Sequence, residues 1–153
     1  MLDQKDFKII KEIVEEFFKK IDLEIFIENL NFREEILFLN LKVKEPKLLI
    51  GERGEALSDL QHLLKAITKR KIKKEFYLDL DINNYKKRKI EYLKELAKNL
   101  ADEVALTKKE KILPPMSAYE RRIIHLELAG RKDVTTQSTG KEPDRKVIIK
   151  LYP

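Results

Sequence analysis

The chain has 153 residues, 42% of them hydrophobic, and a formal net charge of +6. This length and hydrophobic fraction suffice for one domain, or two small ones, with a buried core. Because it has no cysteine and only two histidines, far apart in the sequence, we expect no disulfide, no metal site, no cofactor and a reducing, cytoplasmic location. Acids and lysines interrupt the N-terminal apolar pattern and no apolar run approaches about 18 residues, so the sequence predicts neither a signal peptide nor insertion into a membrane.

The spacing of apolar residues predicts the elements of the first part of the chain. Residues 4–20 have the three-to-four spacing of an amphipathic helix. Alternating apolar residues then predict two strands, at 23–27 and 37–43, joined by a polar turn from Asn31 to Glu34. In the remainder we expect a short helical segment after Pro46, a glycine turn, a long helix, and a third strand at 76–82.

The glycine turn, Gly51-Glu52-Arg53-Gly54, is the first candidate site. Glycine has no Cβ and adopts positive φ, so the turn allows another backbone to approach closely and leaves free N–H donors at a helix N-terminus. Such donors suit a phosphate, which Arg53 could also contact and Glu52 would repel. Ordinary turns between helices also contain two glycines, so the pattern alone leaves both interpretations open.

A run of cations without an acid extends from Lys65 to Lys74, at the end of the helix that follows the turn. Runs of this kind are typical of a solvated face, but they also attract polyanions. The larger basic surplus lies in residues 83–153, which have 17 Lys and Arg against 10 Asp and Glu.

The second part of the chain begins after the polar pair Asn83-Asn84. A long helix is predicted from Tyr85, and its first turns carry four cations, residues 86–89, which oppose the helix dipole and would be stabilised by an anion. The capping box of Ser117 and Glu120 predicts a shorter helix at about 118–129. Two strands follow, at 135–138 and 147–151, joined by a basic loop.

Arg121 and His125 form the second candidate site. They are four residues apart on the shorter helix and so share a face, with Arg122 beside them. An arginine can make a two-pronged contact with phosphate, and a histidine can donate to phosphate or stack on a base. Beside a phosphate the imidazole favours its charged form, so we expect binding to tighten as the pH falls through roughly 6.5. Surface residues with purely local contacts have the same spacing. Further cations of this candidate surface are Arg88, Lys141, Arg145 and Lys146.

The element order of residues 1–82, with GxxG between its two middle helices, resembles a type II KH domain. The resemblance implies a three-stranded sheet with helices on one face. It also implies that the GxxG loop, here Gly51 to Gly54, clamps about four single-stranded nucleotides.

Residues 83–153 resemble the small α/β R-3-H domain, which is named for its Arg-x-x-x-His motif. The resemblance rests on the segment PMSAYERRIIH and on Ser138, Gly140, Glu142, Pro143 and Arg145. A KH domain joined directly to an R-3-H domain is similar to the Jag family of bacterial RNA-binding proteins, also called KhpB or EloR. Many Jag proteins have an additional N-terminal Jag domain, which we expect this chain to lack, so roles tied to that domain are not carried over.

The sequence thus predicts an α+β protein with a KH domain at 1–82 and an R-3-H domain at 83–153. The resemblance implies a post-transcriptional regulator that binds single-stranded RNA, or single-stranded DNA through its C-terminal domain. The alternative is a protein-interaction regulator of cell elongation and division that acts through a KH-only partner protein. We expect no enzyme activity, because Asp79 and Asp81 lack a third acid to hold a metal ion and Gly54 is not followed by a Walker-type lysine.

Overall fold

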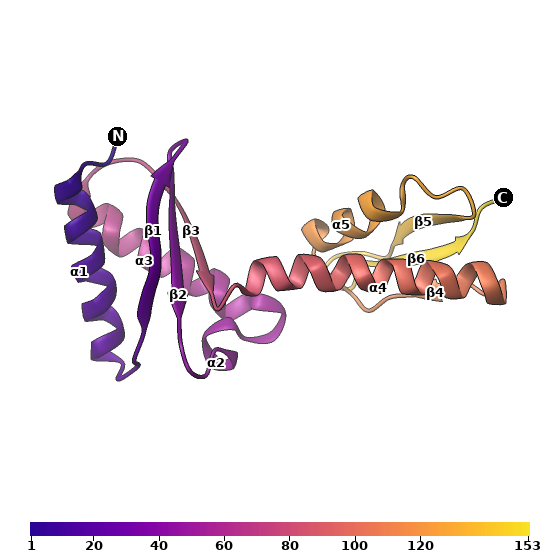
Figure 1. Ribbon diagram of the computed structural model, residues 1–153, viewed down its shortest axis with the longest axis horizontal. Helices are drawn as coiled ribbons and strands as arrows, with labels where there is room; N and C mark the ends of the chain where they lie inside the picture. Colours follow the sequence, from indigo (N-terminus) through magenta and orange to yellow (C-terminus); the bar gives the residue numbers. More distant parts are fainter. The chain divides into compact units, whose positions relative to one another are not determined.

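The computed structural model covers residues 1–153, which form two compact units (Figure 1). Unit 1 consists of Met1–Lys86 and unit 2 of Lys87–Pro153. Each unit has its own apolar core and its own three-stranded sheet, so the fold class is α+β, as predicted. None of the helices combines the length and hydropathy that a membrane span requires.

Unit 1 has the element order that the resemblance to a type II KH domain implies. The glycine turn contains a single 3-10 turn (Glu52–Gly54) between its two helices. The elements are α1 (Gln4–Lys20), β1 (Phe26–Arg33), β2 (Ile36–Lys42), α2 (Lys47–Ile50), α3 (Glu55–Ile72) and β3 (Tyr77–Ile82).

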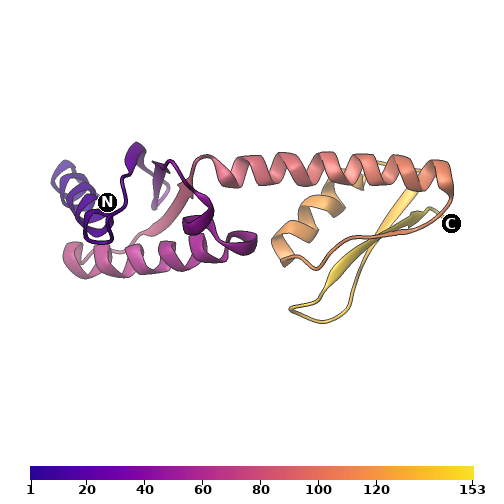
Figure 2. The same ribbon diagram turned by 90° about the horizontal axis from the view of Figure 1, so that it is seen from below.

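The sheet of unit 1 has the strand order β1-β2-β3, with β1 antiparallel and β3 parallel to β2. Side chains alternate between its faces, so Leu39 and Leu80 are fully buried on one face while Asp79 lies on the other. Helices α1 and α3 cover the apolar face (Figures 1 and 2), where Phe18 and Leu64 complete the core. The predicted arrangement of helices on one face is therefore confirmed.

The predicted turn between the first two strands is wrong. The strand predicted at 23–27 is misplaced as well, because β1 starts at Phe26 and continues to Arg33. The turn consists of Glu34 and Glu35, both with positive φ (51° and 64°). A two-residue turn of this kind matches the twist of paired strands. Asn31 lies opposite Phe38 in the ladder and is exposed. A polar residue on the uncovered face does not interrupt a strand, which is why polarity alone misplaced the turn.

Unit 2 contains most of α4 (Tyr85–Thr107), followed by β4 (Lys111–Ile112), α5 (Ala118–Leu128), β5 (Val134–Thr139) and β6 (Lys146–Leu151). The buried side chains of α4 share one core with α5 and the sheet. The predicted capping box of Ser117 and Glu120 is present at the start of α5. The sheet order is β4-β6-β5, with antiparallel pairs, and its two-residue strand β4 was not predicted.

Candidate nucleic-acid interface

The GxxG turn of unit 1 packs tightly against the start of α3. Gly51 has φ 71° and ψ −176°, a conformation essentially restricted to glycine. A Cβ built on Gly51 would lie 2.7 Å from the Cβ of Ala56 and 2.9 Å from its backbone nitrogen. Gly54 has φ 79°, and its Cβ would lie 3.1 Å from the Tyr85 ring. Position 51 therefore requires glycine, whereas position 54 faces a side chain that can move.

The N-terminus of α3 is open. Its N-cap residue is Gly54, which has no side chain to accept a hydrogen bond from the first-turn N–H groups. Arg53 precedes it in the left-handed conformation (φ 56°), is exposed and has no ion pair. The Glu55 N–H, the first of the helix, already donates to the Glu52 carbonyl oxygen in the 3-10 turn. The positive end of an 18-residue helix without a side-chain cap, beside an exposed guanidinium, still favours the binding of an anion. Glu52 is exposed in the same turn, and its charge opposes such binding.

The apolar residues on either side of the turn belong to the core. Ile50 and Leu57 are 7% and 3% exposed and lie in the core cluster of unit 1. Their burial explains why they are apolar without a role in holding bases.

The cations at the start of α4 are partly neutralised by the protein itself. The Asp81 carboxylate accepts a hydrogen bond from the backbone nitrogen of Lys86 (3.2 Å), and the Lys86 ammonium pairs with Asp79. These carboxylates take the place of the anion expected at this helix start. Arg88 stays exposed, without an ion pair.

Arg121 of unit 2 is not the exposed cation that its spacing suggested. It is only 7% exposed. Its Nη1 donates to the Met116 carbonyl oxygen and its Nη2 to Glu142 Oε1, each at 2.7 Å. The guanidinium thus joins the segment before α5 to the loop between β5 and β6. A phosphate can take the place of the carboxylate at Nη2 only if Glu142, whose side chain is 58% exposed, moves away.

His125 lies one turn after Arg121, on the same face of α5 and against β5. Its Nδ1 and Nε2 are each 2.7 Å from a hydroxyl, Thr136 Oγ1 and Ser138 Oγ respectively. Burial, followed by the positive charges of Arg121 and Arg145, lowers the pKa of His125 below its ordinary value of 6.5. The free protein therefore holds this imidazole neutral to lower pH than the sequence led us to expect.

An NMR titration of His125 in the intact chain is expected to give a midpoint below 6.5, and the ordinary value of about 6.5 in urea. Because the folded-state pKa is the lower one, the unfolded chain binds more protons between the two values. The free energy of unfolding should therefore fall as the pH decreases through that interval. Arg145→Gln should raise the folded-state midpoint by removing a nearby positive charge. A folded-state midpoint at or above 6.5 would contradict the assigned environment.

The remaining predicted cations of unit 2 differ in exposure. Arg122 and Lys141 are exposed without ion pairs, whereas Arg145 is half-buried and donates from Nη1 to the Gly140 carbonyl oxygen at 2.7 Å. Lys146, at the start of β6, is half-buried.

The structure brings Arg121 and Arg145 close enough to His125 for their positive charges to lower its pKa. Sequence reasoning did not identify the partners Glu142 and Ser138 as contacts. The sequence did mark both residues, because Ser138 and Glu142 belong to the segment from Ser138 to Arg145 on which the resemblance to the R-3-H domain rests.

Residues 91–151 match the family model of the R-3-H domain. Several curated proteins named "RNA-binding protein KhpB" are similar to the chain. The protein of Clostridium symbiosum is 40% identical over 92% of this chain and 64% of its own length. The protein of Lactiplantibacillus plantarum is 33% identical over 91% of this chain and 42% of its own length. The protein of Bacillus subtilis is 38% identical over 67% of this chain and 50% of its own length. The chain thus spans less than two thirds of the length of these relatives. These matches identify residues 91–151 as an R-3-H domain and show that the chain is similar, over 92% of its length, to a protein of the KhpB (Jag) family.

Proposed function

We propose that this chain binds single-stranded RNA through two surfaces, one in each unit, and that it catalyses no reaction. Residues 1–82 act as a KH domain and residues 83–153 as an R-3-H domain. The relatives' name, RNA-binding protein, supports RNA as the ligand. The observation that carries the proposal is the open N-terminus of α3 at a turn where glycine is sterically required.

In unit 1, an RNA phosphate accepts hydrogen bonds from Arg53 and from amides of the first turn of α3 that follow Glu55. The absence of a Cβ at Gly51 and Gly54 lets the sugar-phosphate chain approach the turn. Glu52 and Glu55 limit the affinity of this surface, because both carboxylates are exposed near the anion.

In unit 2, a phosphate takes the place of the Glu142 carboxylate on Arg121. The Met116 carbonyl already holds the Nη1 end of the guanidinium in position, so the exchange concerns only Nη2. The exposed Arg122 and Lys141 contact neighbouring phosphates, and Arg145 and Lys146 add positive charge. His125 holds β5 against α5 through its two hydroxyl contacts.

Arg53→Ala is expected to weaken binding of a single-stranded RNA 12-mer by about 10-fold, because it removes one charge-assisted phosphate contact. The slope of log K against log salt should become shallower by about 0.7. The matched control is Lys11→Ala, which removes an exposed, unpaired cation from α1. Fluorescence anisotropy between 50 and 200 mM salt (roughly the range in which such contacts dominate) measures both quantities. Equal effects of the two variants would exclude the GxxG turn as a binding surface.

The same titrations with single-stranded DNA and duplex RNA of matched sequence define the ligand class of each unit. A role as a post-transcriptional regulator is part of this proposal. The predicted alternative, regulation of cell elongation and division through a KH-only partner, stays a prediction. Purification of the chain with its bound partners after ribonuclease treatment distinguishes RNA binding from action through a partner protein, because partners bridged by RNA are then lost.

A further inference from the structure

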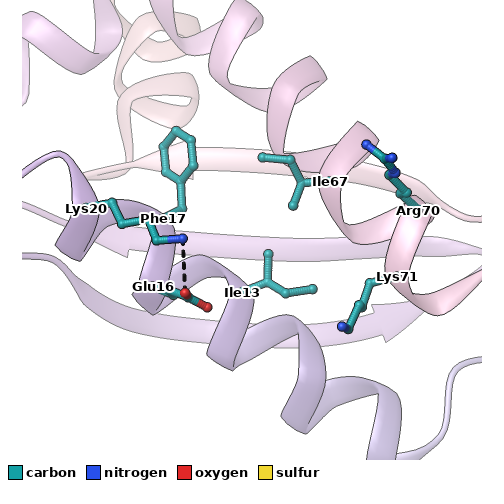
Figure 3. A pocket seen from close by; sticks show the side chains of 7 residues that line it. All are labelled: Ile13, Glu16, Phe17, Lys20, Ile67, Arg70 and Lys71. Atoms are coloured by element: carbon teal, nitrogen blue, oxygen red, sulfur yellow. Dashed lines mark ion pairs between the residues drawn. The ribbon is translucent and has the colours of Figure 1, made fainter.

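A groove of about 510 Å³ lies between α1 and α3 of unit 1 (Figure 3). Its floor is apolar and consists of Ile13 and Phe17 from α1 and Ile67 from α3, all of them half-buried. Ile13 and Ile67 point toward one another across the groove. The floor thus presents aliphatic and aromatic carbon at the surface of unit 1.

The core positions this floor without covering it. The Phe17 ring packs edge-on against Phe18, with ring centroids 5.2 Å apart, and Phe18 is fully buried. Ile13 and Ile67, in contrast, lie outside the core cluster. Burial of two half-exposed isoleucines and part of a phenylalanine ring would favour association with an apolar ligand.

The two ends of the groove differ in charge. At one end, Arg70 and Lys71 are exposed and have no ion pair. At the other end, Lys20 pairs with Glu16 at 3.1 Å (Figure 3). One end therefore has two uncompensated positive charges, whereas the other is balanced.

Two neighbouring cations of the basic run are already paired. Lys69 binds Glu75 at 2.6 Å, and Lys74 binds Asp6 at 2.6 Å. Arg70 and Lys71 are thus the members of the run that face the groove and lack an acidic partner.

We propose that this groove is a docking site for an acidic amphipathic helix of a partner protein. Apolar side chains at positions i, i+3 or i+4, and i+7 of such a helix would cover Ile13, Phe17 and Ile67. Asp or Glu residues at one end of the partner helix would pair with Arg70 and Lys71.

An RNA strand suits the groove less well than a protein helix does. The floor is mainly aliphatic, and Glu16 lies at the end opposite the free cations. The groove is also distinct from the GxxG turn. Arg70 and Lys71 lie in the last turn of α3, about 25 Å along the helix from its glycine N-cap. The docking site is therefore separate from the proposed RNA surface at the GxxG turn, and these two sites can be occupied at once.

The proposal is tested with a designed, fluorescein-labelled helical peptide that carries a leucine stripe and flanking glutamates. One control peptide has the same composition in scrambled order, and a second has lysine in place of each glutamate. In anisotropy titrations of the full chain, we expect each control to bind at least 10-fold more weakly than the acidic amphipathic peptide.

Variants of the chain locate the site. Ile67→Gln and the double variant Arg70→Glu/Lys71→Glu should each weaken peptide binding at least 10-fold while RNA affinity changes less than twofold. Circular dichroism verifies that both variants fold. The matched control is Lys8→Glu/Lys11→Glu, which makes the same charge change at exposed, unpaired positions of α1 and should leave peptide binding within twofold.

Three results would overturn the proposal. The first is equal binding of the acidic, scrambled and lysine peptides. The second is loss of RNA affinity in Arg70→Glu/Lys71→Glu to the same extent as peptide affinity, which would assign the groove to RNA. The third is a wild-type dimer in sedimentation experiments that Ile67→Gln dissociates, which would show that a second copy of the chain covers the groove.

Discussion

Gly51→Ala is expected to lower the free energy of unfolding of unit 1 by about 2–4 kcal/mol, because two costs add at this position. The conformation of Gly51, with φ 71° and ψ −176°, is strained for any residue with a Cβ. The added Cβ would also lie 2.7 Å from the Ala56 Cβ, at the start of α3, where the backbone cannot move freely. Urea denaturation followed by NMR signals of unit 1 measures the loss, with signals of unit 2 as the internal reference.

Gly54→Ala is the matched control. Gly54 has the left-handed conformation, φ 79° and ψ 14°, which costs an alanine about 1–2 kcal/mol. Its Cβ would meet only the Tyr85 ring, at 3.1 Å, and that ring can shift. We therefore expect a smaller loss than for Gly51→Ala. Equal losses for the two variants would contradict the packing of the turn described above.

Arg121→Ala is expected to lower the free energy of unfolding of unit 2 by about 1–3 kcal/mol. The variant leaves the carbonyl oxygen of the buried Met116 without the charged hydrogen-bond donor that it has in the wild type. RNA affinity should fall about 10-fold or more, since the variant removes a preorganised phosphate contact. Arg121→Lys should restore little of the stability or of the RNA affinity. A single ammonium group cannot reach the Met116 carbonyl and a second acceptor at once, as the forked guanidinium does. Denaturation and RNA titration of the two variants measure these effects separately.

Glu142→Gln tests whether Arg121 binds a phosphate or only holds the loop between β5 and β6 in place. If a phosphate replaces the Glu142 carboxylate, the variant should raise RNA affinity about threefold, because glutamine accepts a hydrogen bond without competing as an anion. We expect this result. A fall in affinity would instead show that the pair only holds the loop between β5 and β6 in place. Asp144→Asn provides the control, because it removes a negative charge from an exposed residue of the same loop.

The two candidate sites could be predicted from the sequence to different depths. At the GxxG turn, the glycines and the helix start are adjacent in the sequence, so the local pattern was enough to indicate an open helix N-terminus. At Arg121, the spacing to His125 correctly predicted a shared helix face but not the state of the guanidinium. Its carboxylate partner, Glu142, is 21 residues away and is brought to it by the β5–β6 hairpin.

The sequence by itself determined the helices, the strands other than β1 and β4, and the capping box of α5, because these depend mainly on interactions within about four residues. It misplaced the first hairpin turn, since the exposed face of β1 tolerates Asn31. Only the tertiary structure decided which cations remain free. Lys86 pairs with Asp79, Lys74 with Asp6 and Arg121 with Glu142, whereas Arg53, Arg70 and Lys71 remain unpaired. Ion pairs join residues that are distant in the sequence, so the chain must fold before the charges available to a ligand are defined.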